Sequence, residues 1–409
     1  MEITRLLDIE SKGCFDFFLA EANKDMDTPG FGLIRDRAPD FYDIASIAST
    51  GFGLTAYAIG SERGWISRDQ ARKLASASLD TLLYKAEHTH GFFYHFMHMD
   101  TGKRYGRSEV SVIDTAIAVC GAITAGGYFG GEVAEKAAQL YGRIDWNWFR
   151  DEGKNRFYMG YTPEKGFSGW WDFYAEQLMM YILAAGSDTH PVPGDMFYSF
   201  NRRISRDTKP EFIHSWFGSL FTHQFSHAWI DFRNKTDKWG VDWFENSVRA
   251  SIANREYCIR MRTYFKTLHA RSWGLTACEG PWGYQGRYGA APSALANDEH
   301  IIDGTVPPAG ALGSIVFTPD ESMEALFYYY REHPGLVGRY GLKDAYNLDV
   351  SPAWYSPYVI GIDKGITLLM IENYRSGLVW DLFMSNENVR KGIKEVGLSD
   401  KYSMATALA

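Results

Sequence analysis

Apolar side chains recur at helical spacing through most of the chain. In segment after segment they fall at positions i, i+3, i+4 and i+7, which places them on one face of an α-helix. Conventional helix starts support the pattern, because Ser67 is followed by Gln70 at the third position and Thr318 precedes Pro319. The predicted helices span residues 2–23, 45–62, 67–87, 110–127, 131–149, 172–186, 193–204, 217–233, 241–269, 305–315, 320–333 and 361–375.

The alternation of apolar and polar residues that is typical of strands is scarce. Residues 91–96 and 156–161 predict short hairpin strands within loops. Residues 367–371 could form a strand in isolation, but residues 361–374 as a whole fit a buried helix better. The chain is therefore predicted to be all-α.

The predicted helices are of two kinds. Some are small and apolar nearly all round, as in 45–62 and 110–127, whereas others carry charged residues on one face, as in 67–87 and 131–149. Twelve helices with long loops after alternate members predict an (α/α)6 barrel, in which an outer ring wraps an inner ring and the loops form a cleft at one end. No linker or composition shift interrupts residues 1–409, which predicts a single domain, although two helical domains with a boundary near 188–215 are an alternative.

Composition narrows the possible partners. Aromatic residues make up 16% of the chain, a surplus that must line a very large core or a carbohydrate-binding cleft. The net charge of −8 offers no basic stripe to neutralise phosphates, which argues against a nucleic-acid partner. The four cysteines are widely spaced and lie in apolar contexts, so free buried thiols are expected rather than disulfides or a zinc site.

The sequence also carries expectations about compartment. The chain starts directly with an amphipathic helix and shows no apolar signal region, and no run of about 18 apolar residues predicts a membrane span. A cytoplasmic location is expected for the chain as given, and a periplasmic or secreted one if a leader has been removed. The sequence does not indicate the oligomeric state.

Residues 169–176 combine large aromatics with a carboxylate. Trp170, Trp171 and Phe173 lead to Glu176, which is predicted to lie in the first turn of an apolar helix. An aromatic face can hold a sugar ring, and a partly desolvated acid keeps its proton near neutral pH and can protonate a glycosidic oxygen. The alternative is an ordinary helix start, where acidic residues are favoured by the helix dipole.

Acids and aromatics gather in the loops that would share one end of the barrel. These loops are residues 24–44, 88–109, 150–171, 205–216, 270–304 and 350–360. Paired carboxylates beside aromatics, without metal ligands, are what glycoside hydrolysis requires. Each acid taken alone could be a helix cap or a surface charge, and it is their recurrence at one end that favours a catalytic cleft.

His223 and His227 stand four residues apart on one predicted helix face. This spacing can ligate zinc, but Gln224 and Phe225 occupy the place where a zinc-protease motif has an acid. The two residues are interpreted as core histidines or as hydrogen-bonding partners of a sugar. No metal, nucleotide or flavin cofactor is implied, since phosphate-cradling loops and a Gly-x-Ser-x-Gly elbow are absent from the sequence.

Several blocks of the sequence resemble the bacterial glycoamylase-like family. One is Thr-His-Gln-Phe-Ser-His within residues 220–233, and another is Gly-Ser-Asp-Thr-His at the end of residues 184–190. The matching blocks occur in order along almost the whole chain, at residues 33–37, 46–54, 111–116, 184–190, 220–233, 273–277, 303–305, 361–365 and 370–380. The family is related to endo-β-1,2-glucanases and to the transglycosylase domain of cyclic β-1,2-glucan synthases.

The resemblance implies an (α/α)6 barrel and specific catalytic positions. Glu176 occupies the position of the family's essential glutamate. The second carboxylate comes from the segment before the helix that contains Asp114, which makes Glu109 and Asp114 the candidates. Some β-1,2-glucanases have aspartates where this chain has Arg107 and Ser111, a departure that leaves the mechanism class and exact substrate open.

The expected function is hydrolysis of a β-glucan or gluco-oligosaccharide, most plausibly β-1,2-linked, with Glu176 as proton donor and Glu109 or Asp114 as base or nucleophile. A transglycosylase using the same residues and a non-catalytic carbohydrate-binding protein are the alternatives. The expected partner is an oligosaccharide or polysaccharide, not a nucleic acid or a membrane. The residues expected to bind it are Arg35, Asp36, Trp170, Trp171, Trp216, His223, His227, Trp273, Glu279, Trp282, Tyr284 and Asp363.

Overall fold

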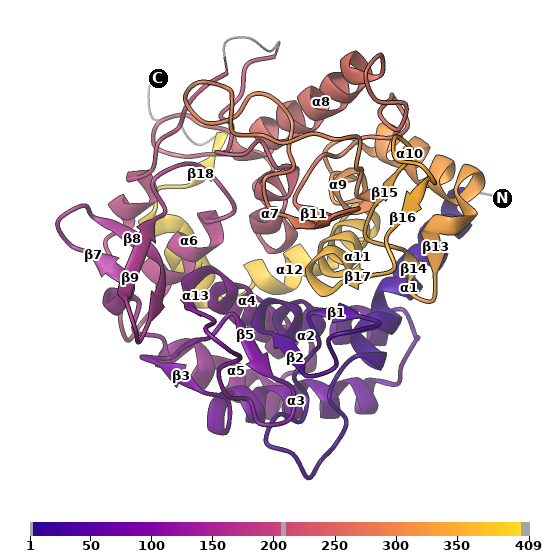
Figure 1. The fold of residues 1–409 in the computed structure, drawn as a ribbon. Helices are drawn as coiled ribbons and strands as arrows, with labels where there is room; N and C mark the ends of the chain where they lie inside the picture. The colour runs from indigo at the N-terminus through magenta and orange to yellow at the C-terminus, as the bar shows by residue number, and fades with distance from the viewer. Residues whose placement is uncertain (1–2, 206–209, 402–409) are drawn as a thin grey trace.

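The computed structural model describes residues 3–205 and 210–401. In Figure 1 the chain circles the molecule from α1 at the right through the bottom, the left and the top, and α11 and α12 then lie near the middle of the view. The α-helices are α1 Ile3–Ala20, α2 Ile47–Glu62, α3 Arg68–Tyr84, α4 Val112–Phe129, α5 Gly131–Arg143, α6 Leu178–Gly186, α7 Phe225–Trp229, α8 Trp243–Met261, α9 Pro308–Leu312, α10 Pro319–Glu332, α11 Gly361–Arg375, α12 Leu378–Met384 and α13 Glu387–Glu395.

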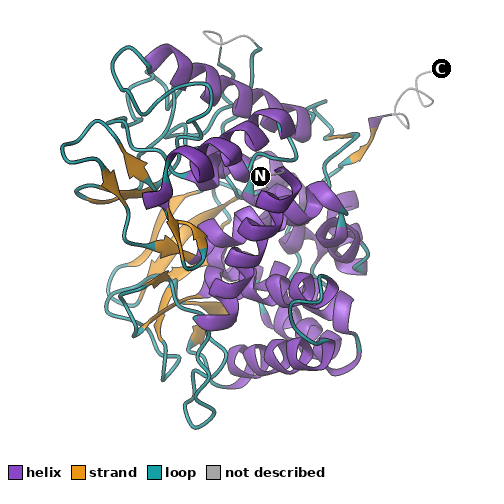
Figure 2. Cartoon of the chain, turned by 90° about the vertical axis from the view of Figure 1, so that its right-hand side faces the viewer, coloured by secondary structure: helices purple, strands orange, loops and turns teal. Residues whose placement is uncertain are grey.

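Short antiparallel strands and long loops gather on one side of the helices, as Figure 2 shows. Most strands pair only once; the largest sheet joins β6, β8, β7 and β9. The strands are β1 Arg37–Ala38, β2 Ile44–Ser46, β3 His88–Thr89, β4 Phe92–Phe93, β5 Phe96–His98, β6 Val110–Ser111, β7 Arg150–Asp151, β8 Arg156–Thr162, β9 Gly166–Trp170, β10 Lys235–Thr236, β11 Cys278–Gly280, β12 Gly283–Gln285, β13 Val337–Gly338, β14 Gly341–Leu342, β15 Tyr346–Asn347, β16 Trp354–Tyr355, β17 Val359–Ile360 and β18 Ser399–Asp400.

The fold is predominantly helical, as predicted, but several boundaries differ. Residues 193–204 form only a 3₁₀ turn, Gly194–Tyr198, and residues 217–233 form the 3₁₀ turn Leu220–His223 followed by the short α7. In residues 217–233, contacts with distant parts of the chain override the long helix that the apolar spacing predicts. One of these contacts is the hydrogen bond that the Gln224 side chain donates to the carbonyl of Gly310 at 2.7 Å. Helices α12 and α13 were missed because each is short, beginning directly after Gly377 or Asn386.

Three buried helices begin directly where a strand ends. Strand β2 leads into α2, β6 into α4 and β17 into α11. Ser46 and Ser111 cap the first two, and the side chain of Ser111 accepts a hydrogen bond from the backbone N–H of Asp114 at 3.2 Å. Each junction therefore places the first turn of its helix next to the side on which the strands and loops gather.

Helices α2 and α4 cross in close contact at two glycines. A Cβ atom added to Gly121 would lie 1.9 Å from the carbonyl oxygen of Gly51, far inside van der Waals contact. Only glycine at this position lets the two helix backbones approach so closely. The crossing fixes the spacing of β2 and β6, the strands that precede these helices.

Helix α4 corrects one expectation about membrane spans. With a mean hydropathy of 1.5 over 18 residues, Val112–Phe129 is long and apolar enough to cross a bilayer by length and composition. However, 78% of it is buried inside the protein. It belongs to a continuous cluster of buried apolar side chains that extends from Leu6 to Leu398, so its composition reflects packing in the core.

Candidate active site

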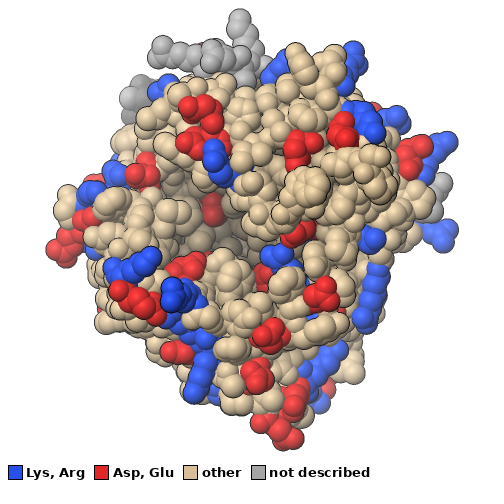
Figure 3. Space-filling model, in the orientation of Figure 1, with Lys and Arg blue, Asp and Glu red and all other residues tan. Residues whose placement is uncertain are grey.

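A cavity of about 410 Å³ opens among the loops on the strand-rich side. Figure 3 shows the hollow near the middle of this face, with acidic side chains inside it. Its walls are mainly aromatic, and they are formed by Met159, Trp170, Trp171, Asp172, Phe173, Tyr174, Ala175, Glu176, Ser215, Trp216, Phe217, Ser219, Phe221, Thr222, Ala277, Tyr284 and Gly286.

Glu176 lies in this cavity, but not inside a helix. The residue precedes Gln177, the N-cap of α6, and lies two residues before the first helical residue, Leu178, so the prediction of a first-turn position was wrong. Its backbone carbonyl accepts a hydrogen bond from Ser226 Oγ at 2.5 Å, and that same hydroxyl accepts from the backbone N–H of Met179 at 3.0 Å. The loop before α6 is thereby tied to α7, which holds the carboxylate in place.

The environment of Glu176 favours its protonated form. Burial raises the pKa of Glu176 to about 7, a backbone hydrogen bond opposes this, and the negative charge of Asp114 adds to the rise. Near neutral pH the carboxyl group is therefore partly protonated. The effect of Asp114 also means that its carboxylate is close enough for Glu176 to sense its charge.

Asp114 and Glu109 meet at one histidine. His95 Nδ1 lies 3.0 Å from Glu109 Oε1, and His95 Nε2 lies 3.8 Å from Asp114 Oδ1. Ser111 Oγ donates a short hydrogen bond to Asp114 Oδ2. The imidazole stacks on Phe96, with ring centroids 3.9 Å apart. His95 is thus held between the two carboxylates that the sequence proposed as alternatives.

His95 carries a positive charge at neutral pH. Burial lowers the pKa of His95, but Asp114 and Glu109 outweigh this effect and raise it to about 9. In return, the hydrogen bond from His95 lowers the pKa of Glu109 although burial acts in the opposite direction. Sequence reasoning missed His95; its place in a predicted hairpin of the loop that contains Glu109 was the available signal.

A second acidic group surrounds Arg37. The Arg37 guanidinium pairs with Asp36 and with Glu279, each at 2.9 Å, and the backbone N–H of Glu279 donates to Asp344 Oδ2 at 2.7 Å. Burial raises the pKa of Asp344, and burial together with the charge of Asp344 raises the pKa of Asp363 well above its usual range. Asp36, Glu279 and Asp363 were predicted, whereas Arg37 and Asp344 were missed because no local pattern marks them.

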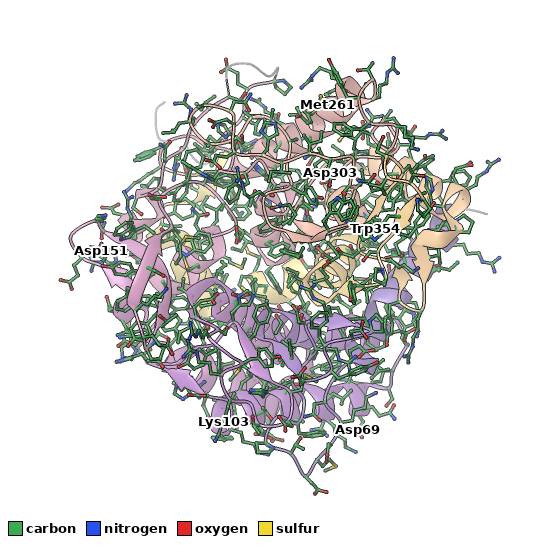
Figure 4. The ribbon with its side chains drawn as sticks, viewed as in Figure 1. Asp69, Lys103, Asp151, Met261, Asp303 and Trp354 are labelled. Carbon is green, nitrogen blue, oxygen red and sulfur yellow. The ribbon has the colours of Figure 1, made fainter. Side chains whose placement is uncertain are left out.

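Four of the predicted aromatics line the cavity, namely Trp170, Trp171, Trp216 and Tyr284. Asp151, labelled in Figure 4 near the outer edge of the β7–β9 sheet, accepts a hydrogen bond from Trp170 Nε1 at 2.9 Å. The other two predicted tryptophans, Trp273 and Trp282, do not line this cavity.

Trp273 is fully buried in the core, where its indole cannot reach a substrate, and Trp282 is 87% exposed in the turn between β11 and β12, outside the cavity wall. The role of Trp273 as a sugar platform is therefore corrected to one in packing.

His223 and His227 are core histidines. Both are almost fully buried, and burial lowers the pKa of each to about 3, so both are neutral. His227 Nε2 lies 3.0 Å from Ser247 Oγ, and its ring packs against Phe232 and Phe317. Of the two interpretations offered for this pair, the structure supports packing over contact with sugar hydroxyls.

Arg35 also departs from its expected place. It pairs with Glu21 at 2.6 Å and lines a separate pocket rather than the cavity of Glu176. Arg35 precedes β1, the strand that contains Arg37 and whose other residue, Ala38, lines this pocket.

The chain is similar to proteins that are named for action on β-1,2-linked glucans. The chain is 29% identical over 437 aligned residues to an exo β-1,2-glucooligosaccharide sophorohydrolase of Parabacteroides distasonis, which covers 96% of this chain and 58% of that protein. The chain thus spans less than two thirds of that relative. It superposes on an endo-β-1,2-glucanase of Chitinophaga pinensis with a TM-score of 0.88 at 28% identity, covering 98% of this chain and 100% of the other.

A β-1,2-glucanase of Parabacteroides distasonis superposes with a TM-score of 0.85 at 28% identity, covering 97% of this chain and 60% of the other. The model of the Glycoamylase family matches residues 169–387, more than half of the chain and a segment that includes Glu176 and most of the cavity wall. The chain belongs to the Glycoamylase family.

Proposed function

We propose that this protein is a glycoside hydrolase that cleaves β-1,2-linked gluco-oligosaccharides or β-1,2-glucan, and that its helices form a single-domain (α/α)6 barrel. The observation that carries the proposal is Glu176, a carboxyl group in an aromatic cavity whose pKa is raised by burial and by the negative charge of Asp114. An acid that keeps its proton near neutral pH and a second carboxylate close by are the two groups that glycoside hydrolysis needs.

The roles of the two groups follow from their surroundings. Glu176, whose pKa is about 7, donates its proton to the glycosidic oxygen as the bond breaks. Asp114 acts on the anomeric carbon, either directly as a nucleophile or by activating a water molecule. Glu109 is bound to the imidazole of His95 at 3.0 Å, so it holds His95 in position and leaves Asp114 as the second catalytic carboxylate.

The proposal of a β-1,2 linkage rests on the names of the relatives. The Chitinophaga pinensis and Parabacteroides distasonis proteins are named for action on β-1,2-linked glucans, and the former was crystallised with sophorotriose and glucose. This chain matches the former over its whole length and has aromatic side chains, including Trp171, Trp216 and Tyr284, that provide stacking surfaces for glucosyl units.

Product analysis tests the proposal. The protein is incubated with linear β-1,2-gluco-oligosaccharides and with β-1,3, β-1,4 and α-1,4 controls, and the products are followed by chromatography and anomeric NMR. Cleavage of the β-1,2 series alone, lost in Glu176→Gln, is the expected result. One free reducing end per bond broken identifies hydrolysis, whereas fewer would identify transglycosylation. Saturable binding without any product would contradict the proposal and favour a carbohydrate-binding role.

A further inference from the structure

The loop between β1 and β2 exposes two aromatic side chains beside the cleft. Phe41 is 41% exposed and Tyr42 is 66% exposed. Phe41 has a φ of 62°, a left-handed conformation that residues with large side chains rarely adopt. Exposed aromatic side chains on a constrained turn are unusual in a surface loop that only connects two strands, so the contacts of these two rings indicate a role for the loop.

A row of rings and one guanidinium leads from the cavity to this loop. Tyr284 lines the cavity, and its ring lies 5.6 Å from the guanidinium carbon of Arg37. On its other side Arg37 lies 5.2 Å from the ring of Phe41, whose centroid is 5.8 Å from that of Tyr358. Arg37 belongs to β1 and Tyr358 directly precedes its partner strand β17, so a ligand that extends out of the cavity along this pair meets aromatic surface.

A second pocket of about 450 Å³ lies on the far side of β1. Tyr42 lines it, and the guanidinium carbon of Arg35 lies 4.4 Å from the Tyr42 ring. Because Glu21 holds Arg35 at 2.6 Å, the guanidinium supports one face of the ring. The lining residues are Glu21, Arg35, Ala38, Pro39, Tyr42, Gly338, Arg339, Tyr340, Lys343, Pro357 and Val359; we refer to them as the Tyr42 pocket.

The Tyr42 pocket is rich in hydrogen-bond donors. Within residues 3–205 and 210–401, neither Arg339 nor Lys343 has a carboxylate within ion-pair distance. Among the described residues, Lys343 Nζ donates only to the carbonyl of Gly335, at 2.9 Å. Donors of this kind bond to hydroxyl oxygens, while an exposed tyrosine ring packs against the C–H face of a pyranose.

We propose that the Tyr42 pocket is a second binding site for the glucan chain, which holds glucosyl units several residues away from the bond that is cleaved. The proposal rests on the proposed function and extends it to substrate length. A chain seated in the cavity runs over Arg37 and Phe41 and reaches Tyr42, so long chains occupy both sites and short ones occupy the cavity alone.

Binding measured against chain length tests this proposal. Calorimetric titration of Glu176→Gln with purified β-1,2-gluco-oligosaccharides of three to about ten units should show affinity rising with length. Adding Tyr42→Ala should weaken binding of the longest chains by about three- to tenfold, the usual worth of one aromatic stacking contact, and change affinity for the trisaccharide less than twofold. Arg339→Ala should act in the same direction.

A matched control is Tyr264→Ala, because Tyr264 is 76% exposed and lines neither the cavity nor the Tyr42 pocket. The proposal is overturned if Tyr42→Ala and Arg339→Ala leave the length dependence the same as in Tyr264→Ala while wild type still cleaves the glucan. Failure of the proposed function looks different, since wild type would then cleave no member of the series, whether or not it binds them.

Discussion

The imidazole of His95 lies 3.0 Å from the carboxylate of Glu109, within hydrogen-bond distance. This contact distinguishes Glu109 from Asp114, which lies five residues further along the chain. His95 lies near both acids: it hydrogen-bonds to Glu109 and lowers the pKa of that carboxyl against the effect of burial, whereas Asp114 lies 3.8 Å from the ring and its negative charge adds to the burial that raises the pKa of Glu176. The two acids therefore have different tasks, although the sequence alone presents them as equals.

Replacing the two acids one at a time should reveal this difference. Asp114→Asn is expected to lower kcat by about 10²- to 10⁴-fold, because the group that acts on the anomeric carbon is lost. Glu109→Gln removes only a positioning contact, and about a tenfold loss is expected. Steady-state kinetics on one β-1,2-gluco-oligosaccharide decide the matter, and equal losses in the two variants would contradict the assignment.

His95→Gln should act mainly on kcat. The glutamine can still hydrogen-bond to Glu109 but lacks the positive charge beside Asp114, so turnover should fall by about tenfold or more while KM changes little. Removal of the imidazolium should also return the pKa of Glu109 toward its ordinary value, which NMR titration of the carboxyl carbon can measure. An unchanged Glu109 titration would mean that the contact does not exist in solution.

The pH dependence of kcat/KM should report Glu176. Its carboxyl must be protonated to act as the acid, and its pKa is raised to about 7, so activity should decline as the pH rises through 7 and fall tenfold per unit at higher pH. A rate profile that remains flat from pH 6 to pH 9 would exclude Glu176 as the acid.

Glu176 should also make stability depend on pH. Its pKa is raised on folding from 4.5 to about 7, so the folded state binds the proton more tightly and loses stability as the pH rises between those values. Glu176→Gln should therefore be more stable than wild type at pH 8 by about 1–3 kcal/mol in free energy of unfolding. Denaturant titrations at pH 5 and pH 8 measure this; the gain should nearly vanish at the lower pH.

Substitution of Trp273 and of Trp216 should distinguish a role in packing from a role in substrate binding. Trp273 is fully buried, so Trp273→Ala should lower the free energy of unfolding by about 3–5 kcal/mol. Trp216 is 38% exposed and lines the cavity, so Trp216→Ala should raise KM with a much smaller loss of stability. Urea unfolding and kinetics on both variants provide the comparison, and the reverse pattern would contradict the placement of both residues.

The sequence predicts what depends on local pattern and misses what depends on distant contacts. Glu176 and its aromatic neighbours were found because they are adjacent along the chain, and the buried helices because their composition is apolar. Arg37 was missed since its partner Glu279 is 242 positions away. His227 was left open between two roles because helical spacing does not show that Phe244 and Phe317, from two other segments, pack against the ring.

The glycine crossing of α2 and α4 has a consequence for how such a protein can diversify. Strand β5, which follows His95, pairs with β2, and Asp114 lies in the first turn of α4, so the positions of the reacting groups depend on a joint between two helix backbones that has no room for a side chain. Loops at the mouth can then be exchanged without disturbing that joint. A library of variants confined to the rim should yield new chain-length preferences, whereas a single methyl group at Gly121 should abolish turnover for every substrate alike.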